Sequence, residues 1–107
     1  MNKEQFIELI KQHQEQSECL DKIEQYGFYL WENPIIEFGF IMFDKVLKSN
    51  FNDEGIDWIN WWLYEKNGIF GDLSAFDEND NETPFDTIED LWNYVKKYRI
   101  NNENFNN

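Results

Sequence analysis

The sequence predicts an α+β fold of about four helices, with one small β-hairpin inserted before the last helix, in a single domain. Apolar residues recur at three- and four-residue steps over most of the chain, which is typical of amphipathic helices. Two short apolar runs flank a polar turn at residues 77–82, which favours a hairpin. Aromatic residues make up 19% of the 107 residues, enough large side chains for the core of a small domain.

The first half of the chain predicts two helices. Residues 3–26 form an amphipathic pattern that Gly27 is expected to end. Pro34 fits the first turn of a second helix over residues 34–49, where its missing N–H costs nothing. The apolar side chains of this second helix occupy nearly every direction around its axis, so we expect it to be the buried central element. The stripe of the first helix is Phe6, Ile10, His13, Ser17, Leu20 and Ile23.

The second half predicts a third helix, the hairpin and a last helix. Asn52 or Asp53 can cap the third helix, residues 54–66, and Asn67-Gly68 is expected to end it. Pro84 confines the second strand to a sheet edge. The single domain is expected to span residues 1–100, followed by a disordered tail at 101–107. The last helix is expected to begin at Asp86 or Thr87 and to carry Ile88, Leu91, Trp92, Val95 and Tyr98.

The charge of the chain narrows the class of partner. Lys and Arg number 9 and Asp and Glu 22, a net charge of −13. This argues against direct binding of nucleic acid or of an anionic membrane, since both depend on basic residues. The polar start of the chain and its short apolar runs predict no signal and no membrane span, hence a cytoplasmic protein. Residues 51–95 contain twelve acidic residues and one basic residue, Lys66, which gives them a net charge of −11.

Signals for an enzyme, a cofactor or a metal are weak, so we expect none of the three. The single histidine, His13, lies on an apolar stripe and is expected to be packed there, while Cys19 has acidic neighbours that disfavour a thiolate. Residues 77–81 begin like a calcium loop, but Glu82 replaces its glycine and Ile88 its final glutamate. A hairpin turn explains this segment more simply. A small hydrolase using two carboxylates stays open as an alternative.

Two surfaces are candidates for binding a partner. Alternating acidic residues in the turn would form a row about 6.6 Å apart if extended, and rows of carboxylates can imitate a nucleic-acid backbone. The acidic residues that begin the last helix are expected to lie close to this row, because only Pro84 and Phe85 lie between Thr83, at the end of the turn, and the helix cap. A solvated face that aids solubility is the alternative interpretation. The acidic candidates are Glu78, Asp80, Glu82, Asp86, Glu89 and Asp90.

The third helix carries the second candidate surface. At about 100° per residue, Trp61 lies at the margin of the apolar face and Tyr64 beyond it, beside Asp57 and Asn60. Exposed aromatic residues framed by carboxylates are typical of protein-binding hot spots. The apolar face itself consists of Trp58, Ile59, Trp62 and Leu63.

Three segments carry a resemblance over roughly residues 34–98: Trp58-Ile59-Asn60-Trp61-Trp62-Leu63-Tyr64-Glu65, the turn at 77–82, and Thr87-Ile88-Glu89-Asp90-Leu91-Trp92. Together they resemble small acidic proteins encoded by bacteriophages and prophages, which often block host defence nucleases.

The resemblance assigns no residue a role, but it implies a function. The chain would be a non-enzymatic, anti-CRISPR or anti-restriction type of inhibitor that binds a basic, nucleic-acid-binding surface of a host defence effector. The alternative is a protein-interaction module, such as an immunity protein or an assembly adaptor, that uses Trp61 and Tyr64.

Overall fold

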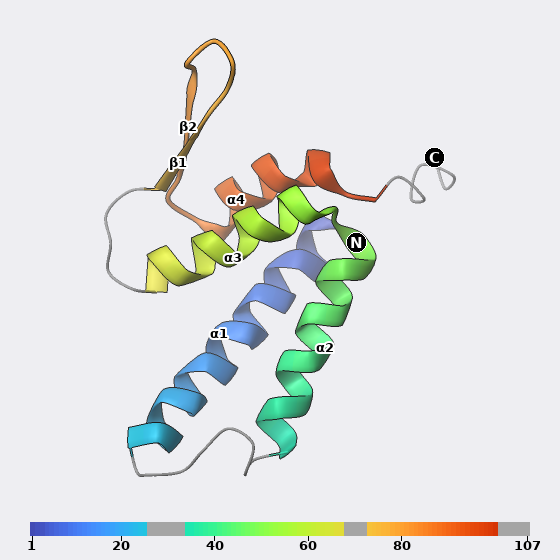
Figure 1. The fold of residues 1–107 in the computed structure, drawn as a ribbon, viewed down its shortest axis with the longest axis vertical. Coiled ribbons are helices and arrows are strands. Elements are labelled where there is room, and N and C mark those ends of the chain that lie inside the picture. The colour runs from blue at the N-terminus through green and yellow to red at the C-terminus, as the bar shows by residue number, and fades with distance from the viewer. Residues whose placement is uncertain (26–33, 68–72, 101–107) are drawn as a thin grey trace. The chain divides into compact units, whose positions relative to one another are not determined.

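The computed structural model describes residues 1–25, 34–67 and 73–100 (Figure 1). The described residues form four α-helices and a two-stranded antiparallel hairpin before the last helix, which confirms the predicted α+β fold. Contacts divide the chain into two compact units, an N-terminal unit, Met1–Ser49, and a C-terminal unit, Asn50–Asn107. The single domain over residues 1–100 stays a prediction, and the predicted tail at 101–107 lies outside the described residues.

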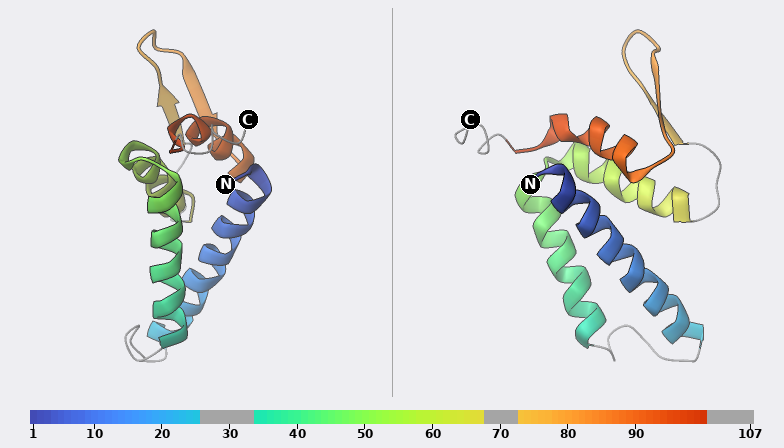
Figure 2. Two further views of the ribbon diagram at one scale, coloured as in Figure 1. Left: turned by 90° about the vertical axis from the view of Figure 1, so that its right-hand side faces the viewer. Right: turned by 180° about the vertical axis from the view of Figure 1, so that it is seen from behind.

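The N-terminal unit consists of helices α1, Lys3–Gln25, and α2, Pro34–Asn50, whose last residue already belongs to the other unit. The two helices lie side by side (Figure 2). Asn2 and Gln5 cap α1 reciprocally, because each side-chain oxygen accepts the other residue's backbone N–H at 2.9 Å. Both predicted helices are confirmed, and the predicted stop at Gly27 lies outside the described residues.

The expectation that α2 is buried all round is wrong. Phe38, Ile41 and Met42 of this helix are 64%, 57% and 40% exposed. Within the described part of the N-terminal unit, α1 is the one helix beside α2, so this unit covers one side of α2. The buried core residues of this unit are Phe6, Ile10, Ile36, Phe43 and Leu47.

The C-terminal unit begins with helix α3, Asp53–Asn67. Asn52 caps it as predicted, since its side-chain oxygen accepts the backbone N–H of Gly55 at 3.1 Å. Strands β1, Leu73–Phe76, and β2, Glu82–Phe85, pair in a register that sets Leu73 opposite Phe85 and Phe76 opposite Glu82. The predicted Gly68 stop lies outside the described residues.

Helix α4, Ile88–Val95, starts at a capping box on Thr87. The Thr87 hydroxyl accepts the backbone N–H of Asp90 at 3.1 Å, and the Asp90 carboxylate accepts the N–H groups of Thr87 and Asp86 at 3.2 and 3.1 Å. The predicted helix was too long, because the chain tightens into a 3-10 turn, η2, over Lys96–Tyr98. Tyr98 therefore lies in η2 and not in α4.

Phe85 is the centre of the packing that joins the hairpin to the helices. Its side chain is fully buried, and its ring meets those of Trp58 on α3 and Tyr94 on α4 at centroid distances of 5.7 and 5.0 Å. The alternation of β1 adds Leu73 and Ala75 to this buried side. The other buried hydrophobic residues of the unit are Phe51, Ile59, Trp62, Leu63, Leu91, Trp92 and Val95.

The start of the C-terminal unit meets the end of its described part. Phe51 and Arg99 form an isolated antiparallel bridge. Beside it, the N–H of Asn52 donates to the carbonyl of Tyr98, and the N–H of Ile100 donates to the carbonyl of Asn50, each at 2.9 Å. Among the described residues, none of the helices combines the length and the apolar character that a membrane span requires.

Candidate functional site

The turn between β1 and β2 is fixed by Asp77. The Asp77 carboxylate accepts the backbone N–H groups of Asn79 and Asn81 at 2.8 and 2.9 Å and the Asn81 side-chain amide at 3.1 Å. The N–H of Asp80 donates to the carbonyl of Asp77 at 3.0 Å. Asp80 has a φ of 61°, a left-handed conformation that aspartate tolerates better than most residues. The turn is therefore held in one shape by its own hydrogen bonds.

The same hydrogen bonds decide the chemistry of Asp77. The backbone N–H of Asn81 foremost, and then the Asn81 amide and the Asn79 N–H, hold the pKa of the Asp77 carboxyl below its usual value. Its oxygens are engaged in shaping the turn, as a hairpin requires. Within residues 1–25, 34–67 and 73–100, no group of three or more His, Cys, Asp or Glu is arranged to hold a metal ion.

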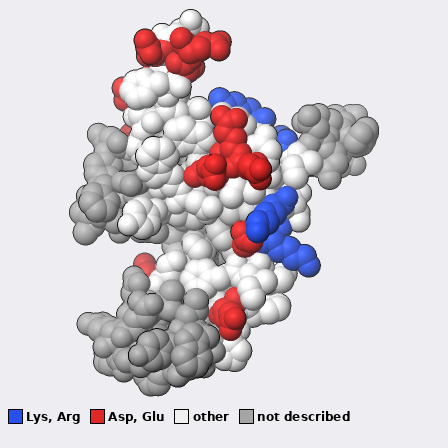
Figure 3. All heavy atoms as spheres, viewed as in Figure 1, with Lys and Arg blue, Asp and Glu red and all other residues white. Residues whose placement is uncertain are grey.

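Glu78 and Asp80 present the charge of the turn to solvent. Both are exposed, and neither forms an ion pair with a residue in the described part of the chain. Glu82 is also exposed and accepts the Ser74 hydroxyl at 2.9 Å. These acidic side chains gather at the free end of the hairpin (Figure 3). We call Glu78, Asp80 and Glu82 the acidic tip.

Two expectations about the acidic surface are wrong. The acidic tip is not an extended row, because the backbone turns back at Asp80 and only Glu82 lies in a strand. The tip is also separate from the acidic start of α4. Four residues of strand rise place the Cα atoms of Glu82 and Asp86 roughly 13 Å apart, and the hairpin points away from α4 (Figure 1).

The acidic residues at the start of α4 play a different part. The Asp90 carboxylate accepts backbone N–H groups in the capping box, so it has a structural role at the start of the helix. Asp86 and Glu89 are exposed, and Glu89 lies in the first helical turn, where the helix dipole favours negative charge. The predicted acidic residues therefore divide into the acidic tip and a group at the start of α4, of which Asp90 caps the helix.

Phe76 is a candidate that the sequence reasoning missed. It lies on β1 opposite Glu82, and its side chain is 61% exposed. Strand alternation places it on the outer face of the hairpin with Ser74, whereas Leu73 and Ala75 turn inward. That alternation was available in the sequence and could have identified Phe76. A large apolar ring thus stands beside the acidic tip.

The predicted aromatic surface on α3 has the expected exposure. Trp61 and Tyr64 are 51% and 72% exposed. The Trp61 ring stacks on that of Trp58 at 5.6 Å and 15°, and Trp58 in turn meets Tyr94 edge-on at 5.3 Å. Trp61 is therefore held on one side by packed rings, whereas the Tyr64 side chain is largely exposed. The predicted apolar face is confirmed in Ile59, Trp62 and Leu63, which are buried.

A cluster of Tyr94, Lys97 and Tyr98 continues this surface and was also missed. The Lys97 ammonium lies 3.9 Å from the centroid of the Tyr94 ring and 5.0 Å from that of Tyr98, a cation–π arrangement. The Tyr98 hydroxyl donates to Glu54 at 3.1 Å. Burial foremost, with Tyr94 and Glu54 adding to it, raises the pKa of Tyr98, so the phenol is neutral. The four-residue spacing of the two tyrosines was the signal for this cluster.

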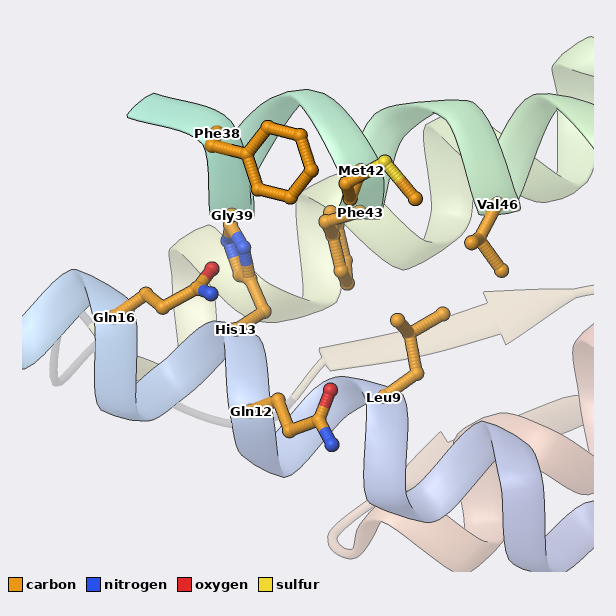
Figure 4. Close-up of a pocket in the computed structure, with 9 residues that line it drawn as sticks. All are labelled: Leu9, Gln12, His13, Gln16, Phe38, Gly39, Met42, Phe43 and Val46. Atoms are coloured by element: carbon orange, nitrogen blue, oxygen red, sulfur yellow. The ribbon is translucent and has the colours of Figure 1, made fainter. Parts of the chain in front are cut away.

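The single histidine is packed, as predicted. The His13 ring stacks on Phe43 at 4.0 Å and meets Phe40 edge-on at 5.1 Å. Burial lowers the pKa of His13, which favours the neutral imidazole. It borders a pocket of about 430 Å³ between α1 and α2, whose wall is mainly apolar (Figure 4). The other lining residues are Leu9, Gln12, Gln16, Phe38, Gly39, Met42, Phe43 and Val46.

Comparison with known proteins adds no relative. No protein-family model matches the chain, and neither a curated protein nor a solved structure is detectably similar to it. The candidate site therefore has to be interpreted from its own geometry.

Proposed function

We propose that this chain is a non-enzymatic inhibitor that binds a basic, nucleic-acid-binding surface of another protein, such as a CRISPR or restriction nuclease in the bacterial cytoplasm. The observation that carries the proposal is the acidic tip, in which Glu78 and Asp80 are exposed and form no ion pair within the described residues, on a turn that the Asp77 carboxylate holds by hydrogen bonds. A preformed turn loses less conformational entropy on binding than a loop that must first become ordered.

The surroundings of the tip support the same partner. The charge of −11 over residues 51–95 would steer a basic protein toward this unit. The acidic side chains would then compete with nucleic acid for the Lys and Arg side chains of that protein. Phe76, exposed beside Glu82, supplies an aromatic group of the kind that anchors protein interfaces. Charge and ring project together from one hairpin.

Amide substitutions at the acidic tip are expected to weaken binding without unfolding the protein. In the triple variant E78Q/D80N/E82Q, asparagine at position 80 tolerates the left-handed backbone, and glutamine at position 82 still accepts the Ser74 hydroxyl. Partners are captured from a bacterial lysate at low salt and identified. Affinity of the purified partner should then fall about fivefold or more in the variant, and steeply with added salt.

The control is a triple variant on α1, E8Q/E15Q/E18Q, which changes the net charge equally at exposed positions. It should bind within about twofold of the parent, because surface charges outside the interface are screened at physiological salt. Short duplex DNA should displace the parent from its partner. The proposal fails if both triple variants bind alike, if affinity is flat with salt, or if DNA does not compete.

The second candidate function is a protein-interaction module that uses the aromatic surface of α3. The exposure of Trp61 and Tyr64, with Trp61 seated on Trp58, favours it. In that case W61A and Y64A should each weaken the partner more than the acidic-tip variant does, by about tenfold for a hot-spot ring. Binding should be restored largely by W61F, which keeps an aromatic ring. Parental binding in both alanine variants would exclude this surface.

A further inference from the structure

The outer edge of strand β1 is a free sheet edge. Among the described residues β1 pairs with β2 alone, in a two-stranded sheet. The Asp77 N–H donates to the Asn81 carbonyl at 3.1 Å, which makes these two residues a hydrogen-bonded pair at the turn. Hydrogen-bonded and non-hydrogen-bonded pairs alternate along an antiparallel ladder, so Phe76 and Ser74 belong to non-hydrogen-bonded pairs. Their backbone N–H and C=O groups therefore point outward, away from β2.

These outward backbone groups are available to another strand. Within the described part of the chain, the backbone groups of Ser74 and Phe76 form no hydrogen bond. The Phe76 side chain is largely exposed, and the turn end of the hairpin stands clear of α3 and α4 (Figure 2). A strand edge with free N–H and C=O groups is a template on which a further strand can pair.

The outer edge of β2 is closed by contrast. Pro84 lies opposite Ser74 in a non-hydrogen-bonded pair, so its ring occupies the outward position at which another residue would present an N–H group. Proline and charged residues are the usual means by which proteins protect a sheet edge, and β2 also carries Glu82. The four residues of β1, Leu73–Phe76, include neither a proline nor a charged residue. An added strand is therefore directed to β1.

We propose that an extended segment of the basic partner protein adds to the outer edge of β1 as a third, antiparallel strand. This inference rests on the proposed function and specifies which part of the partner the hairpin binds. Ser74 and Phe76 each exchange N–H···O bonds with the partner residue directly opposite. Directly opposite residues share a face of the sheet, so these partner side chains lie on the outer face. Glu82 lies on that face too, since it accepts the Ser74 hydroxyl at 2.9 Å.

The charges of this outer face select arginine or lysine at the two opposed positions of the partner. A partner Arg opposite Phe76 lays its guanidinium over the exposed ring, in a cation–π contact. Its charge then points toward Glu82, which lies opposite Phe76 on β2. The intervening partner residues lie on the side of Leu73 and Ala75, which are buried, so apolar residues fit there. The partner segment therefore alternates basic and apolar residues.

Nuclear magnetic resonance of the full chain tests the edge directly. In the free chain the amide protons of Ser74 and Phe76 should exchange rapidly with solvent, whereas those of Ala75 and Thr83, which face the opposite strand, should exchange slowly. The probe is a short blocked peptide of alternating Arg and Val. It should bind with a dissociation constant of about 0.1–1 mM at low salt and, near saturation, slow exchange at Ser74 and Phe76 about tenfold or more. A peptide of alternating Glu and Val should not bind.

The substitution S74P removes one outward N–H group from the edge. The extended backbone should tolerate it, because Pro84 already occupies the equivalent position on β2. S74P should weaken the peptide about tenfold or more. The matched control S74A loses the hydroxyl but keeps the N–H group, so it should bind within about twofold of the parent. Both variants should keep the parental circular dichroism.

Methylated peptides test the same pairing without altering the protein. In the antiparallel arrangement the Arg N–H groups of the peptide point toward β1 and the Val N–H groups point away. Methyl groups on the Arg backbone nitrogens should therefore abolish binding, and methyl groups on the Val nitrogens should change it by no more than about threefold.

The proposal is overturned if the Arg–Val peptide leaves exchange at Ser74 and Phe76 rapid, if S74P and S74A bind it alike, or if the two methylated peptides bind alike. Slow exchange at these amides in the concentrated free chain would assign the edge to a second copy instead. A captured partner that requires the acidic tip but binds S74P and S74A alike would overturn the added strand and leave the proposed function standing. A peptide that pairs with β1 while the captured partner is insensitive to the acidic tip would do the reverse.

Discussion

Replacing Phe85 with alanine is expected to remove about 3–5 kcal/mol from the unfolding free energy of the C-terminal unit. Phe85 is fully buried, and its ring contacts both Trp58 and Tyr94, so the truncation leaves a cavity where the hairpin meets α3 and α4. Strand β2 would lose the side chain by which it is anchored. Urea unfolding followed by tryptophan fluorescence measures this loss, since Trp58, Trp61, Trp62 and Trp92 all lie in this unit.

The matched control is Phe76→Ala on the other strand of the same hairpin. Phe76 is largely exposed, so its truncation should change stability by no more than about 0.5 kcal/mol. The two substitutions delete the same atoms from strands of equal length. Equal losses in both variants would contradict the burial of Phe85 and the outward position of Phe76.

Gly55→Ala is expected to destabilise the C-terminal unit by about 1–3 kcal/mol, although alanine is the better helix former. A Cβ atom at position 55 would lie 2.8 Å from the Cβ of Tyr98 and 3.5 Å from that of Phe51. The Tyr98 Cβ is fixed to a backbone whose carbonyl accepts the Asn52 N–H, so it cannot swing aside. Thermal unfolding should show a lowered melting temperature.

Gly39→Ala provides the contrasting case on α2. There the three atoms nearest to a Cβ atom belong to the side-chain amide of Gln16, which can rotate away. Helix propensity then decides, and the variant should match the parent or gain up to about 1 kcal/mol. If Gly55→Ala were as stable as Gly39→Ala, α3 and η2 could not be packed as closely as described.

The sequence predicted the helices and the hairpin well because their boundaries are local. Pro34 at a first turn, Asn52 as a cap and Thr87 as a cap each depend on a few neighbouring residues. The exposure of α2 could not be predicted in this way. An apolar residue such as Ile41 is compatible with a core or with a surface, and the number of neighbouring helices decides between them.

The arrangement of the acidic residues also escaped prediction, for a reason of length. Few residues separate the tip from the start of α4, which suggested that the two lie close together. In an extended strand, however, each residue adds about 3.3 Å to the distance. Glu82 proved to be the first residue of β2 rather than part of the turn. Asp90 could have been recognised as a cap, because Thr87 precedes it by three residues.

The bridge between Phe51 and Arg99 has a consequence for how the C-terminal unit connects to other chains. Its first residues and residue 100 lie side by side, joined by the hydrogen bond from Ile100 to Asn50. A unit whose first residues lie beside the last residue of its described part is suited to circular permutation and to insertion into a surface loop of a host protein. Because the hairpin is at a distance from that junction, such an insertion would leave its acidic end free to reach outward (Figure 1).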